Sequence, residues 1–160
     1  MANTVTMKSK DTLASSEAKC FVTINGKRYN FMNAIKFEAK MKKKKTKIPI
    51  LGKPGGGNRS VGWEGSGTMT VHYNSSVMRK LELEYMKTGK DFYFDIIVTN
   101  EDKTNELGRQ TIKYLDCNTD ESVLSKFDAN ASDTLQEDIS FTFEDAEMEE
   151  EFAELLGFSM

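Results

Sequence analysis

The chain has 160 residues and a mass of 18.1 kDa, with 38% apolar, 29% charged and 10% aromatic residues and only 2 prolines. This composition excludes collagen-like, disulfide-built and wholly disordered proteins, and the length suits one domain with its own core. No apolar run approaches the roughly 18 residues that span a bilayer, and the first residues do not resemble a signal peptide. We therefore expect a chain that folds in the cytoplasm without contacting a membrane.

The net charge of −3 hides a strong asymmetry between the two halves of the chain. Residues 1–80 carry 16 basic and 4 acidic residues, whereas residues 81–160 carry 6 and 21. The two halves thus have net charges of +12 and −15. Strand-like patterns cross the midpoint without a linker, so the asymmetry does not mark a domain boundary.

The first 32 residues predict a polar arm followed by a β-hairpin. Residues 1–18 are rich in Ser, Thr and Lys and have no periodicity, which is typical of a mobile arm. Cys20, Val22 and Ile24 then alternate with other residues, and Asn25-Gly26 suits a type I′ turn.

A lysine-rich strand and a long loop are expected next. Ile35, Phe37, Ala39 and Met41 alternate with charged residues, which predicts an amphipathic strand. The stretch 42–62 contains two prolines and a triple glycine, so it is interpreted as a loop. Loops of about 20 residues are usually functional or disordered.

The remaining sequence predicts one helix among several strands. Alternation over 63–73 indicates a strand, and helical spacing of apolar residues predicts a helix over about 75–88, ended by Gly89. Strands are expected over 92–98, 109–117, 121–129 and 135–143. The acidic stretch beyond them has Phe152, Leu155 and Leu156 at the spacing of a short amphipathic helix.

These elements indicate a mainly β fold, an antiparallel β-sandwich or barrel with one packed α-helix. The predicted layout is an N-terminal arm (1–18), a single β-sandwich domain (19–143) and an acidic C-terminal segment (144–160).

Known catalytic and metal-binding motifs are absent, which favours a non-enzymatic protein without cofactors. His72 is the only histidine and has no recognisable nucleophile beside it. Asp116, Asn118 and Asp120 have EF-hand spacing, but the glycine and the final glutamate of that motif are missing. Cys20 and Cys117 are interpreted as buried thiols rather than as a disulfide or a redox pair.

The densest charge cluster is a lysine run with six cations in eight residues: Lys40, Lys42, Lys43, Lys44, Lys45 and Lys47. Such a run can bind phosphate backbones, dock on an acidic protein surface, or merely protect a sheet edge. The acidic pI of about 5.3 and the core-facing aromatic residues favour a protein partner over nucleic acid. The acidic C-terminal segment is the complementary surface, and contact between copies in a head-to-tail manner would build rings or filaments.

The ordered set of these features resembles the tail tube proteins of contractile-tailed phages and phage tail-like particles, in particular that of PBSX-like defective prophages of Gram-positive bacteria. The features are the first hairpin, the lysine-rich strand end, the Gly-rich stretch, Gly65-Ser66-Gly67-Thr68-Met69-Thr70 before a helix, Lys87-Thr88-Gly89-Lys90-Asp91 before an aromatic strand, and Phe141-Thr142-Phe143-Glu144-Asp145. The likeness covers roughly residues 19–150.

The resemblance implies a structural subunit of the inner tail tube, with hexameric rings stacked into a hollow conduit inside a contractile sheath. It implies homo-oligomerisation, partner sheath, baseplate or initiator and tape-measure proteins, and DNA only as transient cargo. The particle, an infectious phage or a headless bacteriocin, would be assembled in the bacterial cytoplasm. In such proteins the N-terminal arm and the long loop contact the neighbouring ring.

Two sets of site residues follow from this hypothesis. The inter-subunit set comprises the six lysines of the run with Glu147, Glu149, Glu150 and Glu151. The lumen-facing set comprises Asp91, Asp95, Asp116 and Asp138, because a DNA conduit needs a wall that repels phosphate. The alternative hypotheses are a small β-barrel that binds nucleic acid through Lys40–Lys47 and, third, an enzyme with an unfamiliar site.

Overall fold

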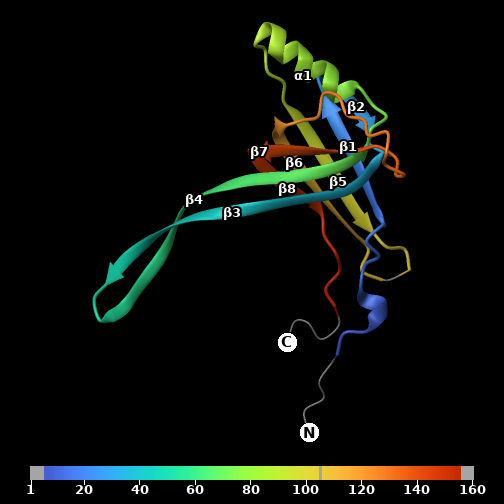
Figure 1. Cartoon of the computed structure of the whole chain (residues 1–160). Helices are drawn as coiled ribbons and strands as arrows, with labels where there is room; N and C mark the ends of the chain where they lie inside the picture. The colour runs from blue at the N-terminus through green and yellow to red at the C-terminus, as the bar shows by residue number, and fades with distance from the viewer. Residues whose placement is uncertain (1–5, 105, 156–160) are drawn as a thin grey trace. The chain divides into compact units, whose positions relative to one another are not determined.

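The computed structural model describes residues 6–104 and 106–155. This part of the chain contains eight strands, one α-helix and one short 3₁₀ turn (Figure 1). The hydrogen-bonded strand order is β2-β1-β5-β6-β7-β4-β3, with β8 paired to β6. The pairings β1–β2, β1–β5, β3–β4, β4–β7 and β6–β7 are antiparallel. The prediction of a mainly β, antiparallel fold with one α-helix is confirmed.

The elements have the following bounds: η1 (Ser9–Asp11), β1 (Ala18–Ile24), β2 (Lys27–Asn30), β3 (Ala34–Ile50), β4 (Lys53–His72), α1 (Val77–Thr88), β5 (Phe94–Glu101), β6 (Arg109–Glu121), β7 (Gln136–Phe143) and β8 (Asp145–Glu150). Contacts within the chain divide it into two compact units. Unit 1 takes the described residues of 1–32, 94–115 and 146–160, and unit 2 takes 33–93 and 116–145.

Unit 1 is built on paired apolar strands. The β1–β2 turn has positive φ at Asn25 (51°) and Gly26 (80°), as a type I′ turn requires, so the predicted hairpin is confirmed. On β1, the buried residues Cys20, Val22 and Ile24 lie opposite buried residues of β5, namely Val98, Ile96 and Phe94. Alternate residues thus form one buried face, as the period of two in each strand predicts.

Unit 2 is centred on the pairing of β4 with β7. Phe141 and Phe143 of β7 lie in register with Gly67 and Gly65 of β4. A Cβ atom on Gly67 would lie 2.5 Å from Phe141 Cζ, and one on Gly65 would lie 2.4 Å from Phe143 Cε2. The missing side chains therefore leave the space that the two aromatic rings occupy, and this packing fixes the register of β4 against β7.

The helix of unit 2 is shorter and less buried than its pattern predicts. It begins at Val77 and ends before Gly89, which has φ of 74° and donates its amide to the carbonyl of Tyr85. Only Met78 is buried, whereas Tyr85 and Met86 are 44% and 67% exposed. The first turns of α1 therefore anchor it to unit 2, and its last turn projects.

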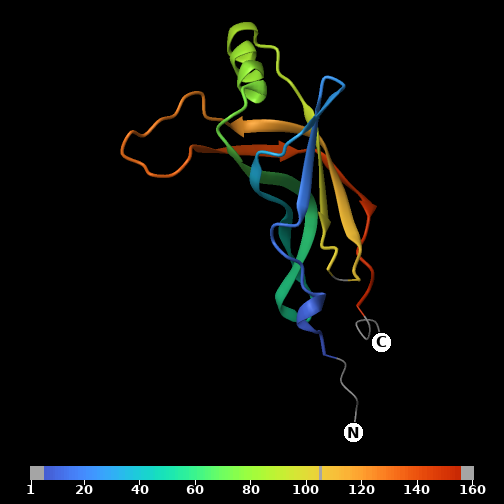
Figure 2. The ribbon, with the colours of Figure 1, turned by 90° about the vertical axis from the view of Figure 1, so that its right-hand side faces the viewer.

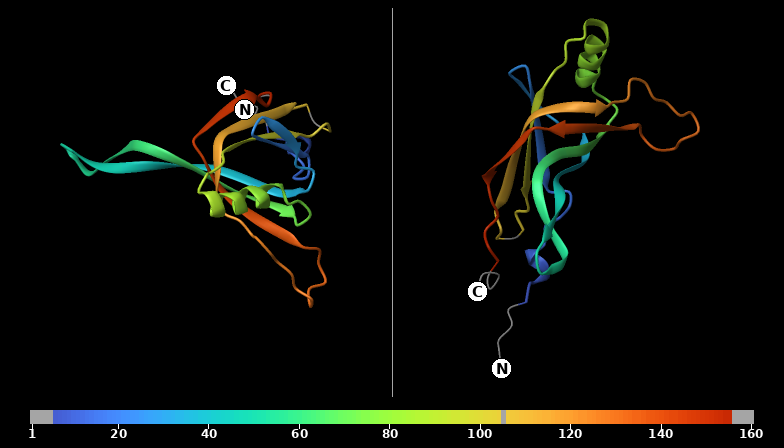
Figure 3. Two further views of the ribbon diagram at one scale, coloured as in Figure 1. Left: turned by 90° about the horizontal axis from the view of Figure 1, so that it is seen from above. Right: turned by 90° about the vertical axis from the view of Figure 1, so that its left-hand side faces the viewer.

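The prediction of a loop over 42–62 is wrong. These residues form the outer part of the β3–β4 hairpin, which extends well past the segment of β4 that pairs with β7 (Figures 1 and 3). Pro49 and Pro54 fall at a register irregularity near the tip, where Gly52 and Gly56 have positive φ. Within the described residues, each strand of this outer ribbon pairs only with the other, so both have an open edge. A proline whose missing amide faces this open edge removes no hydrogen bond between strands.

Two further local predictions are wrong. Residues 122–135 form no strand; they make the long loop between β6 and β7 (Figure 2). Its carbonyl at Leu124 accepts side-chain hydrogen bonds instead of a strand ladder. In the acidic segment, 145–150 is strand β8 and 151–155 is not helical, while 156–160 lies outside the described residues. Closely spaced acidic residues repel one another in a helix, which favours the extended strand.

Replacing Gly67 with alanine should destabilise unit 2. The new Cβ would also lie 2.7 Å from the carbonyl oxygen of Glu38, so neither neighbour can accommodate it without a shift. Overpacking of this kind lowers the free energy of unfolding by about 1–3 kcal/mol. Urea unfolding measures this loss, and Gly62→Ala is the matched control because its Cβ would meet nothing within 4 Å. Equal stability of the two variants would contradict the packing described.

Candidate functional site: a basic hairpin and an acidic strand

The lysine run lies along β3, from Lys40 opposite Ser66 of β4 outward into the projecting part of the hairpin, and all its members are exposed. Alternation places them on two faces: Lys40, Lys42 and Lys44 on one, and Lys43, Lys45 and Lys47 on the other. The second face continues outward from Phe37, which stacks on Phe141 with ring centroids 5.7 Å apart. The core-facing side of β3 thus becomes a basic surface once it leaves the core.

The two lysine faces differ in their partners. Lys40 Nζ lies 3.3 Å from Glu38 Oε1, and Lys44 Nζ lies 4.0 Å from Glu64 Oε2. Within residues 6–104 and 106–155, no carboxylate lies within ion-pair distance of Lys43, Lys45 or Lys47. The charge of this second face therefore has no ion-pair partner among the described residues.

The hairpin also exposes apolar side chains that the sequence analysis did not single out. Ile50 is 48% exposed, Val61 62% and Leu51 fully exposed at the turn. Val61 is the extra residue at the irregularity where the register passes from Lys44–Gly62 to Lys45–Ser60. The glycines and prolines of 42–62 led to its interpretation as a loop, so the sequence analysis did not assign these apolar residues to strands.

The four predicted glutamates lie on and just after β8. Glu150 differs from the other three because it is hydrogen-bonded within its own chain. Glu150 Oε2 accepts a hydrogen bond of 2.5 Å from Arg109 Nε, and its Oε1 accepts one of 3.2 Å from Thr111 Oγ1. The hydrogen bond from Arg109 lowers the pKa of Glu150. Glu147, Glu149 and Glu151 are exposed and make no such ion pair among the described residues. Glu150 thus has an internal role.

Of the four predicted lumen-facing aspartates, three belong to unit 2 and one to unit 1. Asp91 Oδ2 accepts a hydrogen bond of 2.7 Å from Asn118 Nδ2, and Asp138 Oδ1 accepts one of 2.6 Å from Thr70 Oγ1. Asp116 is exposed and has a positive φ of 52°. Asp95 is half-buried on β5 of unit 1, whereas the other three belong to unit 2.

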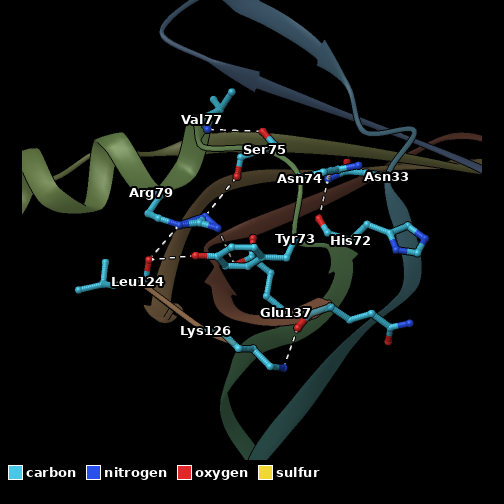
Figure 4. Close-up of polar contacts among 11 residues, drawn as sticks. Asn33, His72, Tyr73, Asn74, Ser75, Val77, Arg79, Leu124, Lys126 and Glu137 are labelled. Carbon is cyan, nitrogen blue, oxygen red and sulfur yellow. Dashed lines mark hydrogen bonds and ion pairs between the residues drawn. The ribbon is translucent and has the colours of Figure 1, made fainter. Parts of the chain in front are cut away.

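A buried polar network, which the sequence analysis did not predict, holds α1 and the 122–135 loop in place (Figure 4). The Arg79 guanidinium donates to Glu137 Oε2, the Leu124 carbonyl and the Ser75 carbonyl, and it lies 4.2 Å from the centre of the Tyr73 ring. Glu137 sits on the buried face of β7 with Ile139. Because alternate residues of a strand share a face, its position two residues before the apolar Ile139 could have predicted that Glu137 is buried.

Burial raises the pKa of Glu137, while the charges of Arg79 and Lys126 act in the opposite direction. The side chains of Arg79 and Glu137 are 14% and 8% exposed, so the pair is largely removed from water. Lys126 Nζ also donates to the Gln136 carbonyl at 2.7 Å. These contacts give the loop fixed attachment points at Leu124 and Lys126.

A second buried carboxylate attaches the N-terminal arm within unit 1. Asp102, only 5% exposed, accepts hydrogen bonds from the amide of Ala14 (3.0 Å) and from the amide and hydroxyl of Thr104. The hydrogen bonds from Thr104, and then that from Ala14, lower its pKa. The Glu101 amide also donates to the Glu17 carbonyl at 3.2 Å. The end of the arm nearest β1 is therefore attached to the end of β5.

The described residues contain two buried thiols but no clustered metal ligands. Among them, no group of three or more His, Cys, Asp or Glu is arranged to hold a metal ion. Cys20 and Cys117 are buried and form no disulfide, as predicted, and burial raises the pKa of Cys20 to about 12. No helix in 6–104 or 106–155 has the length and apolar character needed to cross a membrane.

Comparison with known proteins identifies one family. The model of the family described as "Phage tail tube protein" matches residues 5–150. The phage-like element PBSX protein XkdM of Bacillus subtilis (strain 168) is 28% identical over 148 residues, which cover 92% of this chain and 97% of XkdM.

Two solved structures share the fold at low sequence identity. A chain in the cryo-EM structure of the anti-feeding prophage baseplate superposes with a TM-score of 0.64 and 9% identity, covering 89% of this chain and 97% of its own. A chain in the sheath-tube complex of the extracellular contractile injection system PVC gives a TM-score of 0.62 and 9% identity, with 88% and 93% covered.

Replacing Arg79 with alanine should destabilise unit 2, because it leaves the Glu137 carboxylate buried without its cation. Loss of one partner of a buried pair typically costs about 3–5 kcal/mol. The pKa of Glu137 should also rise further, since the opposing charge of Arg79 disappears. Urea unfolding measures the first effect and NMR titration the second. The neighbouring exposed Lys80→Ala is the control, and an Arg79→Ala variant as stable as this control would refute the role of the pair.

Replacing Asp102 with alanine should detach the N-terminal arm, because Ala14 loses its hydrogen-bond acceptor. Hydrogen–deuterium exchange of residues 12–17 should accelerate, whereas Asp11→Ala, which affects only the 3₁₀ turn, should leave this exchange unchanged. Since the folded-state pKa of Asp102 is lowered, its stabilising contribution is complete above about pH 4 and is lost as the pH falls further. Unchanged exchange in Asp102→Ala would contradict the attachment.

Proposed function

The chain belongs to the phage tail tube protein family and is a structural subunit of a tail tube, and we propose that its copies form hexameric rings that stack into a hollow conduit inside a contractile sheath. The observation that carries this proposal is the match of the family over residues 5–150, nearly the whole chain. The six-fold symmetry of the anti-feeding prophage baseplate and the sheath around the tube of the PVC system support the ring number and the sheath.

The projecting hairpin supports a role in assembly. Residues 65–72 of β4 pair with β7, but the ribbon beyond them has no other strand partner within the described chain. An isolated two-stranded ribbon is at best marginally stable in water. A second copy that covers this ribbon would stabilise it, so we place the hairpin between neighbouring copies, together with the N-terminal arm.

The charge distribution supports a directed contact between copies. We propose that the inter-subunit residues are drawn from the six lysines on β3 (Lys40, Lys42, Lys43, Lys44, Lys45 and Lys47) and the four glutamates on and just after β8 (Glu147, Glu149, Glu150 and Glu151). Exposed ion pairs contribute only about 0–1 kcal/mol each. Their role is therefore to select register and orientation, while strand pairing and apolar contacts supply cohesion.

We further propose that Asp91, Asp95, Asp116 and Asp138 face the lumen. Asp91, Asp116 and Asp138 are exposed, and Asp138 lies on the polar face of β7, opposite the buried aromatic residues. An acidic wall repels phosphate, so DNA passing as transient cargo would not adhere to it.

The proposed biological setting follows from the relatives, which are components of phage tails and tail-like particles. The subunit would assemble in the bacterial cytoplasm on a baseplate or initiator, around a tape-measure protein and within a sheath. Its role would be non-enzymatic.

Shortening the hairpin should abolish tube formation without unfolding the subunit. We propose replacing residues 44–62 with Asn-Gly, which joins the paired residues Lys43 and Trp63 and retains all of β4 that pairs with β7. The circular dichroism spectrum and the thermal midpoint should stay close to those of the intact chain, because the deleted ribbon pairs only with itself. Negative-stain microscopy of particle-producing cells should show rods of uniform width for the intact chain and none for the shortened one.

Two outcomes would overturn the proposed function. One is a particle whose inner tube lacks this chain. The other is steep, salt-dependent DNA binding that replacing Lys42–Lys45 with alanine abolishes, which would instead identify a nucleic-acid-binding protein.

A further inference from the structure

We propose that the outer edge of β3 in one copy adds to the outer edge of β8 in a second copy, with Lys43, Lys45 and Lys47 opposite Glu147, Glu149 and Glu151. This inference rests on the proposed assembly of copies into a tube. It goes further by naming the two strand edges, the lysine face that takes part and the face that does not.

The charges form two ladders with the same spacing. Lys43, Lys45 and Lys47 occupy alternate positions on one face of β3. Glu147 and Glu149 occupy alternate positions on β8, and Glu151 follows two residues later, directly beyond the strand end. Each ladder therefore has three charges separated by about 6.6–6.8 Å, the rise of two strand residues. Strands that pair in register can oppose all three.

Contacts within the chain already engage several of the charges outside this set of six. Lys40 and Lys44, on the other face of β3, already lie near Glu38 and Glu64. On β8, Glu150 is held by Arg109 and Thr111. The alternation of side chains then directs Glu147 and Glu149 away from the face that carries Glu150.

Both strands have an edge that can accept a partner. β3 ends the strand order and pairs only with β4, and β8 pairs only with β6 within the described chain. Strand addition at such edges supplies backbone hydrogen bonds, and cross-strand pairs of opposite charge stabilise it.

The same charges exclude the wrong pairings. Two β3 edges would bring lysines opposite lysines, and two β8 edges would bring glutamates opposite glutamates, which is destabilising in each case. Of these three pairings, β3 of one copy with β8 of another is the one that brings opposite charges together. The contact is therefore heterologous, the kind that closes a ring or propagates along a stack.

Charge reversal tests the proposed pairing in cells that produce the particle. Variant H carries Lys43→Glu, Lys45→Glu and Lys47→Glu, and variant T carries Glu147→Lys, Glu149→Lys and Glu151→Lys. Each alone should reduce the number of tubes seen by negative-stain microscopy at least roughly tenfold, because three like-charge pairs form. Both sets in one chain should restore the number to within roughly threefold of the unchanged protein.

Coexpression of H and T as separate chains distinguishes a contact between copies from one within a chain. Between copies, the reversed hairpin of H meets the reversed strand of T, and the unchanged hairpin of T meets the unchanged strand of H, so tubes return. A contact within one chain would be restored only by the combined variant, and that result would overturn the inference.

The opposite lysine face supplies the matched control. Lys40→Glu, Lys42→Glu and Lys44→Glu change the same charge on the same strand and should leave the tube number within roughly threefold. Full tube formation by H, or equal loss in this control, would refute the assigned face. In either case the unchanged protein would still form tubes; their absence there would count against the proposed function instead.

Cross-linking provides a second measurement that does not depend on tube number. The central pair, Lys45→Cys with Glu149→Cys, lies opposite whether the strands run parallel or antiparallel, so oxidation of assembled tubes should give disulfide-linked dimers and higher species. Lys44→Cys with Glu149→Cys places the thiols on opposite faces and should not cross-link. The native Cys20 and Cys117 are buried and should not interfere. Equal cross-linking of the two pairs would overturn the proposed register.

Discussion

The packing of Phe141 and Phe143 over Gly67 and Gly65 is the contact on which the architecture of unit 2 depends. It holds residues 65–72 of β4 against β7 in one register, because the rings fit only where β4 lacks side chains. β4 is 20 residues long, so the rest of it must continue beyond the core with β3 as its only partner. The projecting basic hairpin is thus a direct consequence of how β4 is anchored.

The buried charged groups attach the irregular parts of the chain to the strands. Arg79 and Glu137 attach the first turn of α1 and the 122–135 loop within unit 2. Asp102 attaches the arm, and Glu150 attaches the acidic strand within unit 1. Each of these groups is satisfied by hydrogen bonds inside its own unit. Lys43, Lys45 and Lys47 on β3 and Glu147, Glu149 and Glu151 on and after β8 have no such ion-pair partner among the described residues, so these charges suit contact with another copy.

In the proposed assembly, the division between charges with and without internal partners gives the contact its direction. A basic edge on β3 and an acidic edge on β8 disfavour pairing through two copies of the same edge. Weak contacts of this kind would be repeated around each ring and along each stack, so their sum would be large although each is small. Exposed strand edges of opposite charge would thus supply the polarity and the repetition that a tube requires.

The sequence by itself determined the mainly β class, the first hairpin with its Asn25-Gly26 turn, the position of the helix and the family, because these depend on local periodicity, turn chemistry and the order of motifs. Only the tertiary structure decided that 42–62 is a ribbon, that 122–135 is a loop and that 145–150 is a strand. Proline and glycine are tolerated where a strand has an open edge, and Glu150 can be distinguished from its acidic neighbours only by its contacts with Arg109 and Thr111. Which strand lies at an edge and which side chains contact one another depend on pairing between residues that are distant in sequence. A local sequence pattern therefore does not predict them.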